Sequence, residues 1–196
     1  SEMVKVKGKW AKRIAAVSLA CALGAGAVGA LVGCSSDSRS NSDEMSVAWT
    51  SNAGEYNLDP TNNYMGWQGS YLGIYEQLFR IDANFDPQPM LAESAEMVND
   101  TTWKITIREG VTFQNGNELN AQAVADCLNR TISMNERAKK SLDIANMEAD
   151  GNVLTVTTNS LNTAFKNELS EPVASIIDVN SGAAEDEPVG TGPYKI

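Results

Sequence analysis

Histidine is absent from this chain of 196 residues. It is the usual general base near neutral pH and the commonest protein ligand of transition metals. Its absence excludes Ser-His-Asp and Cys-His nucleophile systems, and it excludes zinc sites built on imidazole. Much of enzyme chemistry is removed in this way, and we expect neither catalytic residues, nor a metal site, nor a cofactor.

Positive charge is scarce beyond the first 34 residues. The whole chain has 15 Lys plus Arg against 25 Asp plus Glu, a formal net charge of −10. Residues 1–34 contain five of the basic side chains and one of the acidic ones, which leaves ten basic and 24 acidic side chains in the rest. A body this acidic has no basic surface with which to displace counterions from phosphates, so we expect no nucleic-acid partner.

The first 34 residues have the pattern of an export signal. A basic opening at 5–13 precedes an apolar run at 14–31, and small residues then lead to Cys34. This order is typical of a secretory leader. Its end resembles a bacterial lipobox, which implies that Cys34 carries a lipid and anchors the protein to the extracytoplasmic face of the cell membrane. A membrane-spanning anchor and a plain secreted form are the alternatives, and all three place the body outside the cytoplasm.

Cysteine is scarce as well, at Cys21, Cys34 and Cys127. If Cys21 leaves with the leader and Cys34 carries a lipid, Cys127 has no partner for an intrachain disulfide. Its place on the apolar stripe of an expected helix predicts a buried thiol. Residues 35–44 have no apolar side chain to bury, so we expect a flexible tether over 35–45.

The body mixes strand and helix patterns without regular alternation of the two, which indicates an α+β fold. Residues 103–108 alternate apolar and polar side chains, as a half-buried strand does. Asn120 is a suitable N-cap for a helix that continues through Ile132. The other expected elements are a strand at 45–49, helices at 72–79 and 137–146, a strand at 153–157 and a short helix at 164–169.

Seven short motifs follow one another along the body. They are Leu58-Asp59-Pro60, Ile74-Tyr75-Glu76-Gln77-Leu78, Pro89-Met90-Leu91-Ala92-Glu93-Ser94, the run from Trp103 to Phe113, Asn115-Gly116, Asn120-Ala121 and Gly190-Thr191-Gly192-Pro193-Tyr194. In this order, behind a lipobox, they resemble the peptide/nickel (family 5) solute-binding proteins of bacterial ABC importers. The resemblance covers about residues 45–196.

This resemblance implies a periplasmic-binding-protein-like fold of type II, with two lobes that enclose a ligand. By analogy, residues 1–34 are the leader, 35–45 the tether, 46–79 the start of lobe one, 80–188 an inserted α+β subdomain, and 189–196 the return to lobe one. Proteins of the family are usually more than twice as long. The chain is therefore expected to be a fragment or a truncated product that lacks the opposite lobe.

The resemblance also implies where a ligand would bind. It places the loop after Leu58-Asp59-Pro60 at the cleft, and Tyr64, Gly66 and Trp67 are the candidate ligand-binding residues, with packing between lobes as the alternative role. Trp103 and Phe113 are expected in the core because they share strand faces with other apolar residues. Gln114 stands where the family often has histidine, and the turn is expected to tolerate this.

The implied function is a monomeric receptor that binds di- or oligopeptides and delivers them to the permease subunits of an importer. A nickel chelate is a second ligand class, weakened by the absence of histidine and by the lack of a tryptophan in 137–146 that the metal-chelate type has. A surface lipoprotein without a transport role, such as a peptide-signal receptor or an adhesin, is another alternative. A third class of function is a hydrolase that uses the carboxylates of Asp59 and Glu76.

Overall fold

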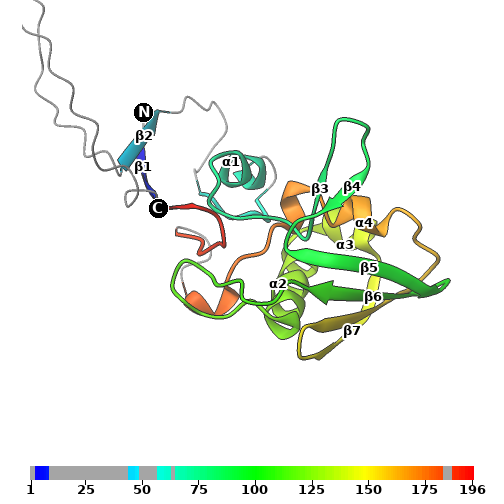
Figure 1. Cartoon of the computed structure of the whole chain (residues 1–196). Helices are drawn as coiled ribbons and strands as arrows, with labels where there is room; N and C mark the ends of the chain where they lie inside the picture. Colours follow the sequence, from blue (N-terminus) through cyan, green and yellow to red (C-terminus); the bar gives the residue numbers. More distant parts are fainter. Residues whose placement is uncertain (1–2, 9–43, 49–56, 63–64, 183–186) are drawn as a thin grey trace, which may run out of the picture.

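The fold centres on a four-stranded antiparallel sheet with a long helix against it (Figure 1). The computed structural model describes residues 3–8, 44–48, 57–62, 65–182 and 187–196. The strand order in this sheet is β5-β6-β8-β7, and helix α2 packs on β7 and β8. The bounds are β5 Ala92–Asn99, β6 Thr102–Ile107, β7 Ile144–Asp150, β8 Val153–Thr158 and α2 Ala121–Met134.

Strand β6 forms where the sequence alternates, which confirms the predicted strand. Trp103, Ile105 and Ile107 are buried and point to the same face, because successive side chains of a strand point to opposite faces. The strand predicted at 153–157 is also confirmed, as β8. Strand β5 was not predicted: its burial is irregular, and a register shift between Ala92 and Ser94 interrupts its pairing with β6.

Helix α2 begins at the predicted cap. The side chain of Asn120 accepts a hydrogen bond from the amide of Ala123 at 3.0 Å, and the apolar face of the helix is buried against the sheet. Asn135 then ends α2 and caps α3, which spans Glu136–Leu142. The predicted helix at 137–146 is therefore partly wrong, because Asp143 adopts a left-handed conformation (φ 51°) and the following residues form β7.

The helix predicted over 72–79 is wrong. The structure instead has helix α1 at Met65–Tyr71, and Gly73 with φ 67° ends it. From Ile74 the chain is extended and buried, with a bridge from Glu76 to Ile176, before it enters β3. An extended segment buried on both sides has apolar side chains in both directions, and this pattern was mistaken for a helical stripe.

Strand β3 (Phe79–Ile81) forms a hairpin with β4 (Pro87–Pro89), so the region 82–89 contains no helix. The chain between β8 and its C-terminal end is mostly irregular. Its described residues include α4 at Phe165–Glu168, which confirms the short helix predicted at 164–169, and the 3-10 turns η1 at Pro172–Ala174 and η2 at Val179–Ser181.

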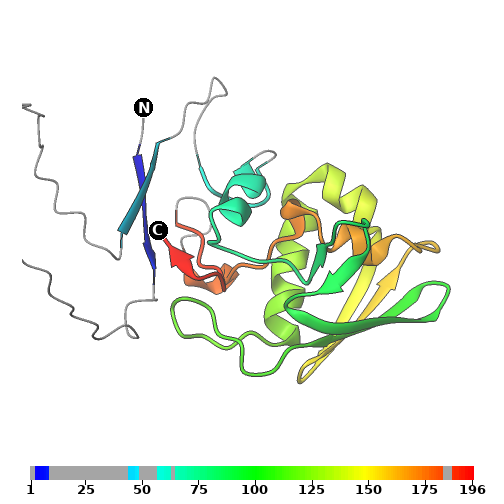
Figure 2. The same cartoon turned by 45° about the horizontal axis from the view of Figure 1, so that its top comes forward.

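A separate three-stranded sheet joins the two ends of the chain, with order β2-β1-β9 (Figure 2). Strand β2 (Glu44–Ala48) confirms the first strand predicted for the body, although it begins within the stretch assigned to the tether. Strand β1 (Met3–Gly8) comes from the expected leader and pairs with both β2 and β9 (Tyr194–Lys195). The leader, tether and lobe boundaries stay predictions.

The core contains the side chains that the sequence assigned to it. Trp103 and Phe113 are buried, and the ring of Trp103 packs on that of Phe165 with centroids 5.7 Å apart. Cys127 is buried, and burial raises the pKa of its thiol to about 11, so the thiolate form is disfavoured. No helix in the described part of the chain is long and apolar enough to cross a membrane.

Candidate functional site

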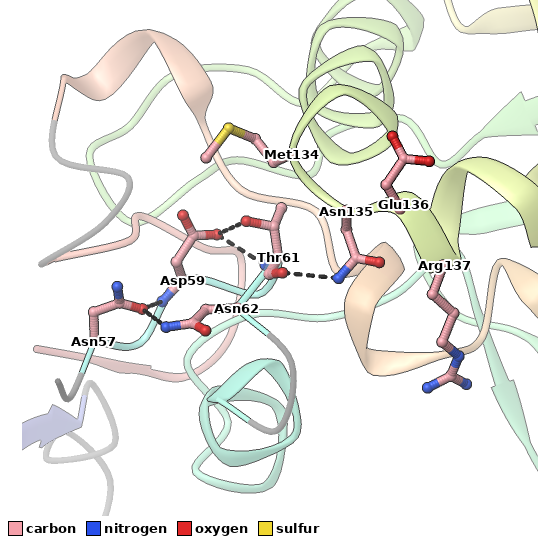
Figure 3. Close-up of a pocket in the computed structure, with 8 residues that line it drawn as sticks. All are labelled: Asn57, Asp59, Thr61, Asn62, Met134, Asn135, Glu136 and Arg137. Carbon is pink, nitrogen blue, oxygen red and sulfur yellow. Dashed lines mark hydrogen bonds between the residues drawn. The ribbon is translucent and has the colours of Figure 1, made fainter. Parts of the chain in front are cut away.

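An open polar pocket of about 430 Å³ lies between the Leu58-Asp59-Pro60 segment and the junction of α2 with α3 (Figure 3). Two short stretches far apart in the sequence supply its lining. The lining residues are Asn57, Asp59, Thr61, Asn62, Met134, Asn135, Glu136 and Arg137.

Asp59 is the anchor of the pocket's floor. Asp59 is only 2% exposed. Its carboxylate accepts two hydrogen bonds from the Arg130 guanidinium: Nη1 lies 3.0 Å from Oδ1, and Nη2 binds Oδ2. The same Oδ1 accepts the amide and the hydroxyl of Thr61, each at 2.8 Å. Burial alone would raise the pKa of Asp59, but the hydrogen bonds from Arg130 and Thr61 outweigh it and lower the pKa.

Two further hydrogen bonds hold the backbone around Asp59. The Tyr75 hydroxyl donates to the carbonyl oxygen of Leu58 at 3.0 Å, and the Asn135 side-chain amide donates to that of Thr61 at 2.9 Å. Burial raises the pKa of Tyr75, so its hydroxyl remains a donor at physiological pH. The segment is therefore fixed both from the extended chain after α1 and from the α2–α3 junction.

Asparagine side chains form the near rim of the pocket. The Oδ1 atom of Asn57 accepts the amide of Asp59 at 3.2 Å and the side-chain amide of Asn62 at 3.0 Å. These contacts order the two amides next to each other (Figure 3). Amide groups can donate to and accept from a solute, which suits peptide bonds and carboxylates alike.

The opposite rim has neighbouring charges of opposite sign. Glu136 and Arg137 lie in the first turn of α3, and both are exposed. The Arg137 side chain extends away from the Asp59 loop (Figure 3), and its Nη2 lies 3.5 Å from Oε2 of Glu171. Exposed ion pairs of this kind are weak, so a carboxylate of a solute could replace Glu171 at small cost.

The candidate residues from the sequence lie partly elsewhere. Gly66 and Trp67 belong to α1, and Trp67 is 38% exposed and is not among the described residues that line this pocket. Tyr64 and Cys34 lie outside the described residues. Next to Trp67, the Oε1 atom of Gln68 is buried without a hydrogen-bond partner in the described part of the chain. The assignment of the ligand-binding residues and of the lipid stays a prediction.

Sequence reasoning missed Arg130 and Asn135. Asn135 has a local signal, because an Asn before an acidic first turn is typical of a helix cap. Arg130 has none, since its partner Asp59 lies 71 positions earlier.

The carboxylates of the expected hydrolase alternative are both engaged in structural contacts. Asp59 is paired with Arg130, and Oε2 of Glu76 accepts the hydroxyl of Thr191 at 2.8 Å. Among the described residues, no cluster of three or more Cys, Asp or Glu side chains could hold a metal ion. The polar pocket offers charged and amide groups that can recognise a solute.

A sequence model of the bacterial extracellular solute-binding proteins, family 5 (middle part), matches residues 86–196. The nickel-binding protein NikA of Staphylococcus aureus is 34% identical over 126 residues, which cover 64% of this chain and 26% of that protein. The glutathione-binding protein GsiB of Escherichia coli strain K12 is 33% identical over 136 residues, with 63% and 26% covered. The chain thus spans about a quarter of the length of these relatives.

Solved structures have the same fold. A nickel ABC transporter structure from Bacillus halodurans is 39% identical, with a TM-score of 0.69, and the match covers 74% of this chain and 30% of that one. The binding protein DppA of Helicobacter pylori, in complex with the peptide STSA, is 21% identical with a TM-score of 0.60 over 73% and 35%. The expected α+β fold, as part of a periplasmic-binding-protein-like protein of family 5, is confirmed.

Proposed function

Because this chain belongs to the bacterial extracellular solute-binding proteins of family 5, we propose that it is part of a receptor for an ABC importer. The receptor binds a small solute outside the cytoplasm and delivers it to the permease subunits. The observation that carries the proposal is the pocket of about 430 Å³ beside Asp59, a volume within the usual range for small-molecule sites. A binding role without catalysis agrees with the structural engagement of Asp59 and Glu76.

The pocket chemistry favours a short peptide or another solute derived from amino acids. Such a solute has an ammonium group, a carboxylate and amide groups. Glu136 and Arg137 offer charges of both signs, and Asn57 and Asn62 offer amides. Resemblance to the glutathione-binding relative, whose ligand is a tripeptide, supports the same class.

A nickel chelate is the second candidate. The nickel-binding relative of S. aureus and the B. halodurans structure support it, at 34% and 39% identity. The chain has no histidine. A metal would therefore enter this part of the site inside an organic chelator, whose carboxylates Arg137 could bind.

Trp67 and Gly66, together with Tyr64, remain the proposed contacts on the α1 side. The exposed ring of Trp67 and the unpartnered Oε1 of its neighbour Gln68 support a role for α1 in contacting a solute or the opposite lobe. For the location of the receptor, we keep the lipid on Cys34 and the extracytoplasmic face of the membrane as parts of the proposal.

Native mass spectrometry of the protein purified gently from the bacterium that makes it tests the function. We expect an additional mass that denaturation releases and that identifies the solute. Titration calorimetry with a tripeptide, glutathione, nickel with L-histidine, and nickel alone then separates the two ligand classes. Binding of none of these probes, together with no co-purified solute, would contradict the transport role and favour the surface lipoprotein.

Variants at the pocket connect binding to the site. Arg137→Gln removes a lining charge and is expected to weaken binding of the preferred probe by about tenfold or more. Lys140→Gln is the matched control, because Lys140 is also exposed on α3 but does not line the pocket. Equal effects of both variants would show that general charge, rather than this pocket, attracts the solute.

A further inference from the structure

Arg130 lies on α2 but acts on a distant segment. Its guanidinium reaches Asp59, 71 positions earlier, through two parallel hydrogen bonds. Arg130 does not line the pocket, whereas Asp59 and Thr61 do. Arg130 can therefore influence a solute through these two residues.

The carboxylate of Asp59 connects Arg130 to the shape of the pocket. Its Oδ1 atom accepts Nη1 of Arg130 at 3.0 Å and also the amide and hydroxyl of Thr61 at 2.8 Å. The carbonyl oxygen of Thr61 is held in turn by Asn135 at the end of the same helix. Thr61 is thus tied to α2 twice: its amide and hydroxyl through Asp59 and Arg130, and its carbonyl oxygen through Asn135.

A planar guanidinium is needed for this geometry. The two Nη atoms match the two oxygens of a carboxylate, whereas the single ammonium of a lysine can satisfy one oxygen at a time. The Arg130 side chain is 19% exposed and that of Asp59 is 3% exposed, so the pair is largely removed from water. Removal of the partner of a carboxylate buried in this way is strongly destabilising, because it leaves a buried charge without compensation.

We propose that Arg130 is a positioning residue of the solute site, which holds the segment 57–62 in its binding shape through Asp59. This inference rests on the proposed function of the pocket. It assigns to α2 a second role besides packing on the sheet: the last turns of this helix set the rim and the floor of the pocket together.

Hydrogen exchange at single amides tests the positioning without any ligand. The Thr61 amide reports the carboxylate of Asp59, while the Ala138 amide reports the Asn135 cap, which does not involve Arg130. In Arg130→Lys we expect at least about tenfold faster exchange at Thr61, because a charge-assisted hydrogen-bond arrangement is lost, and unchanged exchange at Ala138. Arg130→Met extends the series, and Arg130→Lys keeps it informative if the Met variant does not fold.

Binding then tests the consequence for the solute. With glutathione and with nickel plus L-histidine as probes, Arg130→Lys is expected to lower the affinity by about tenfold for whichever probe the wild type binds. Arg137→Lys, a charge-conserving change on the pocket rim, should weaken binding without altering Thr61 exchange. This difference separates a residue that orients the site from one that contacts the solute.

The outcomes distinguish this inference from the proposed function. If the wild type binds no probe while Arg130→Lys still exchanges the Thr61 amide faster, the proposed function is overturned and the positioning of the segment 57–62 stands. If Thr61 exchange is unchanged in folded Arg130→Lys and Arg130→Met, the positioning role is overturned, whatever the wild type binds. Faster exchange at Thr61 with unchanged affinity for a bound probe would also overturn it.

Discussion

Gly192 lies directly against the backbone of Ile74. Its amide donates to the carbonyl oxygen of Ile74 at 3.1 Å, and a Cβ atom at this position would overlap the backbone of Gly73 and Ile74. The neighbouring Tyr194 amide donates to the carbonyl oxygen of Gly73, also at 3.1 Å. The Gly190-to-Tyr194 motif thus crosses the extended chain after α1 at a distance that only glycine permits.

The first prediction concerns this crossing. Gly192→Ala is expected to lower the free energy of unfolding by about 2 kcal/mol or more, because the added methyl group meets backbone rather than a side chain that can move. Urea unfolding followed by circular dichroism measures the change. Gly110→Ala is the control: Gly110 has open space but φ 73°, so only backbone strain of about 1 kcal/mol is expected. Equal losses would show that crowding at Ile74 is not the cause.

Gln114 hydrogen-bonds both segments of this crossing, the Gly190-to-Tyr194 motif and the extended chain after α1. Its Nε2 donates to the carbonyl oxygens of Ile74 at 2.8 Å and Gly192 at 3.1 Å and, closest of all, to that of Tyr194. Its Oε1 accepts the amide of Gly190 at 3.3 Å. The sequence pattern predicted only a turn at Gln114, whereas its side chain connects two distant segments.

Gln114→Glu keeps the shape of this side chain but replaces a donor by a carboxylate oxygen that faces carbonyl oxygens. We expect a loss of about 2 to 3 kcal/mol in the free energy of unfolding at neutral pH. The loss should be smaller near pH 4, since a protonated carboxyl can again donate. Gln122→Glu, at an exposed position on α2, should change the stability by less than about 0.5 kcal/mol. A neutral Gln114→Glu would contradict the role of this contact.

The lowered pKa of Asp59 predicts a dependence of stability on acid. Its folded-state pKa lies below the ordinary value of 3.8, so the unfolded chain binds the proton first as the pH falls. The contribution of Asp59 is therefore complete above about pH 5 and decreases as the pH falls through its folded-state pKa. Asp178, which accepts the side-chain amides of Asn115 and Asn117, has a lowered pKa as well and adds to the same trend.

The Asp59 contribution can be isolated with a variant. The free energy of unfolding of the wild type should fall between about pH 5 and pH 3, and Asp59→Asn should be less stable at pH 6 but have a flatter profile over this range. Glu109→Gln, in the exposed turn after β6, should follow the wild-type slope. Parallel profiles of the wild type and Asp59→Asn would show that the pair with Arg130 does not control acid stability.

The sequence was sufficient where the structure depends on local pattern. Strand β6 follows its alternation, α2 begins at its Asn120 cap, and β8 forms at the predicted strand. Each of these features is encoded within a few neighbouring residues. The order of the motifs then identified the family, although each motif alone is weak.

Contacts between distant segments could not be predicted in this way. Residues 72–79 satisfy a helical spacing, yet Gly73 ends α1 and the following chain is buried by partners such as Ile176 and Gly192. The floor of the pocket has the same character, because Arg130 and Asp59 meet only once α2 packs. The sequence pattern predicted a candidate site in the loop after Leu58-Asp59-Pro60, but it could not name the residues that hold the pocket beside this segment.

Tyr75 holds the segment 57–62 at Leu58, and a variant shows whether this contact is independent of Arg130. Its hydroxyl donates to the carbonyl oxygen of Leu58, and its ring fills the space beside Gly69. Tyr75→Phe keeps the ring and leaves a buried carbonyl without this donor, so we expect a loss of about 1 to 2 kcal/mol in thermal or urea unfolding. Tyr71→Phe, at an 80% exposed position, should be neutral.

Hydrogen exchange in the same variant separates the two contacts. In Tyr75→Phe the Thr61 amide should keep its exchange rate, because the Arg130–Asp59 pair is intact. Faster exchange at Thr61 would mean that the segment 57–62 moves as one unit.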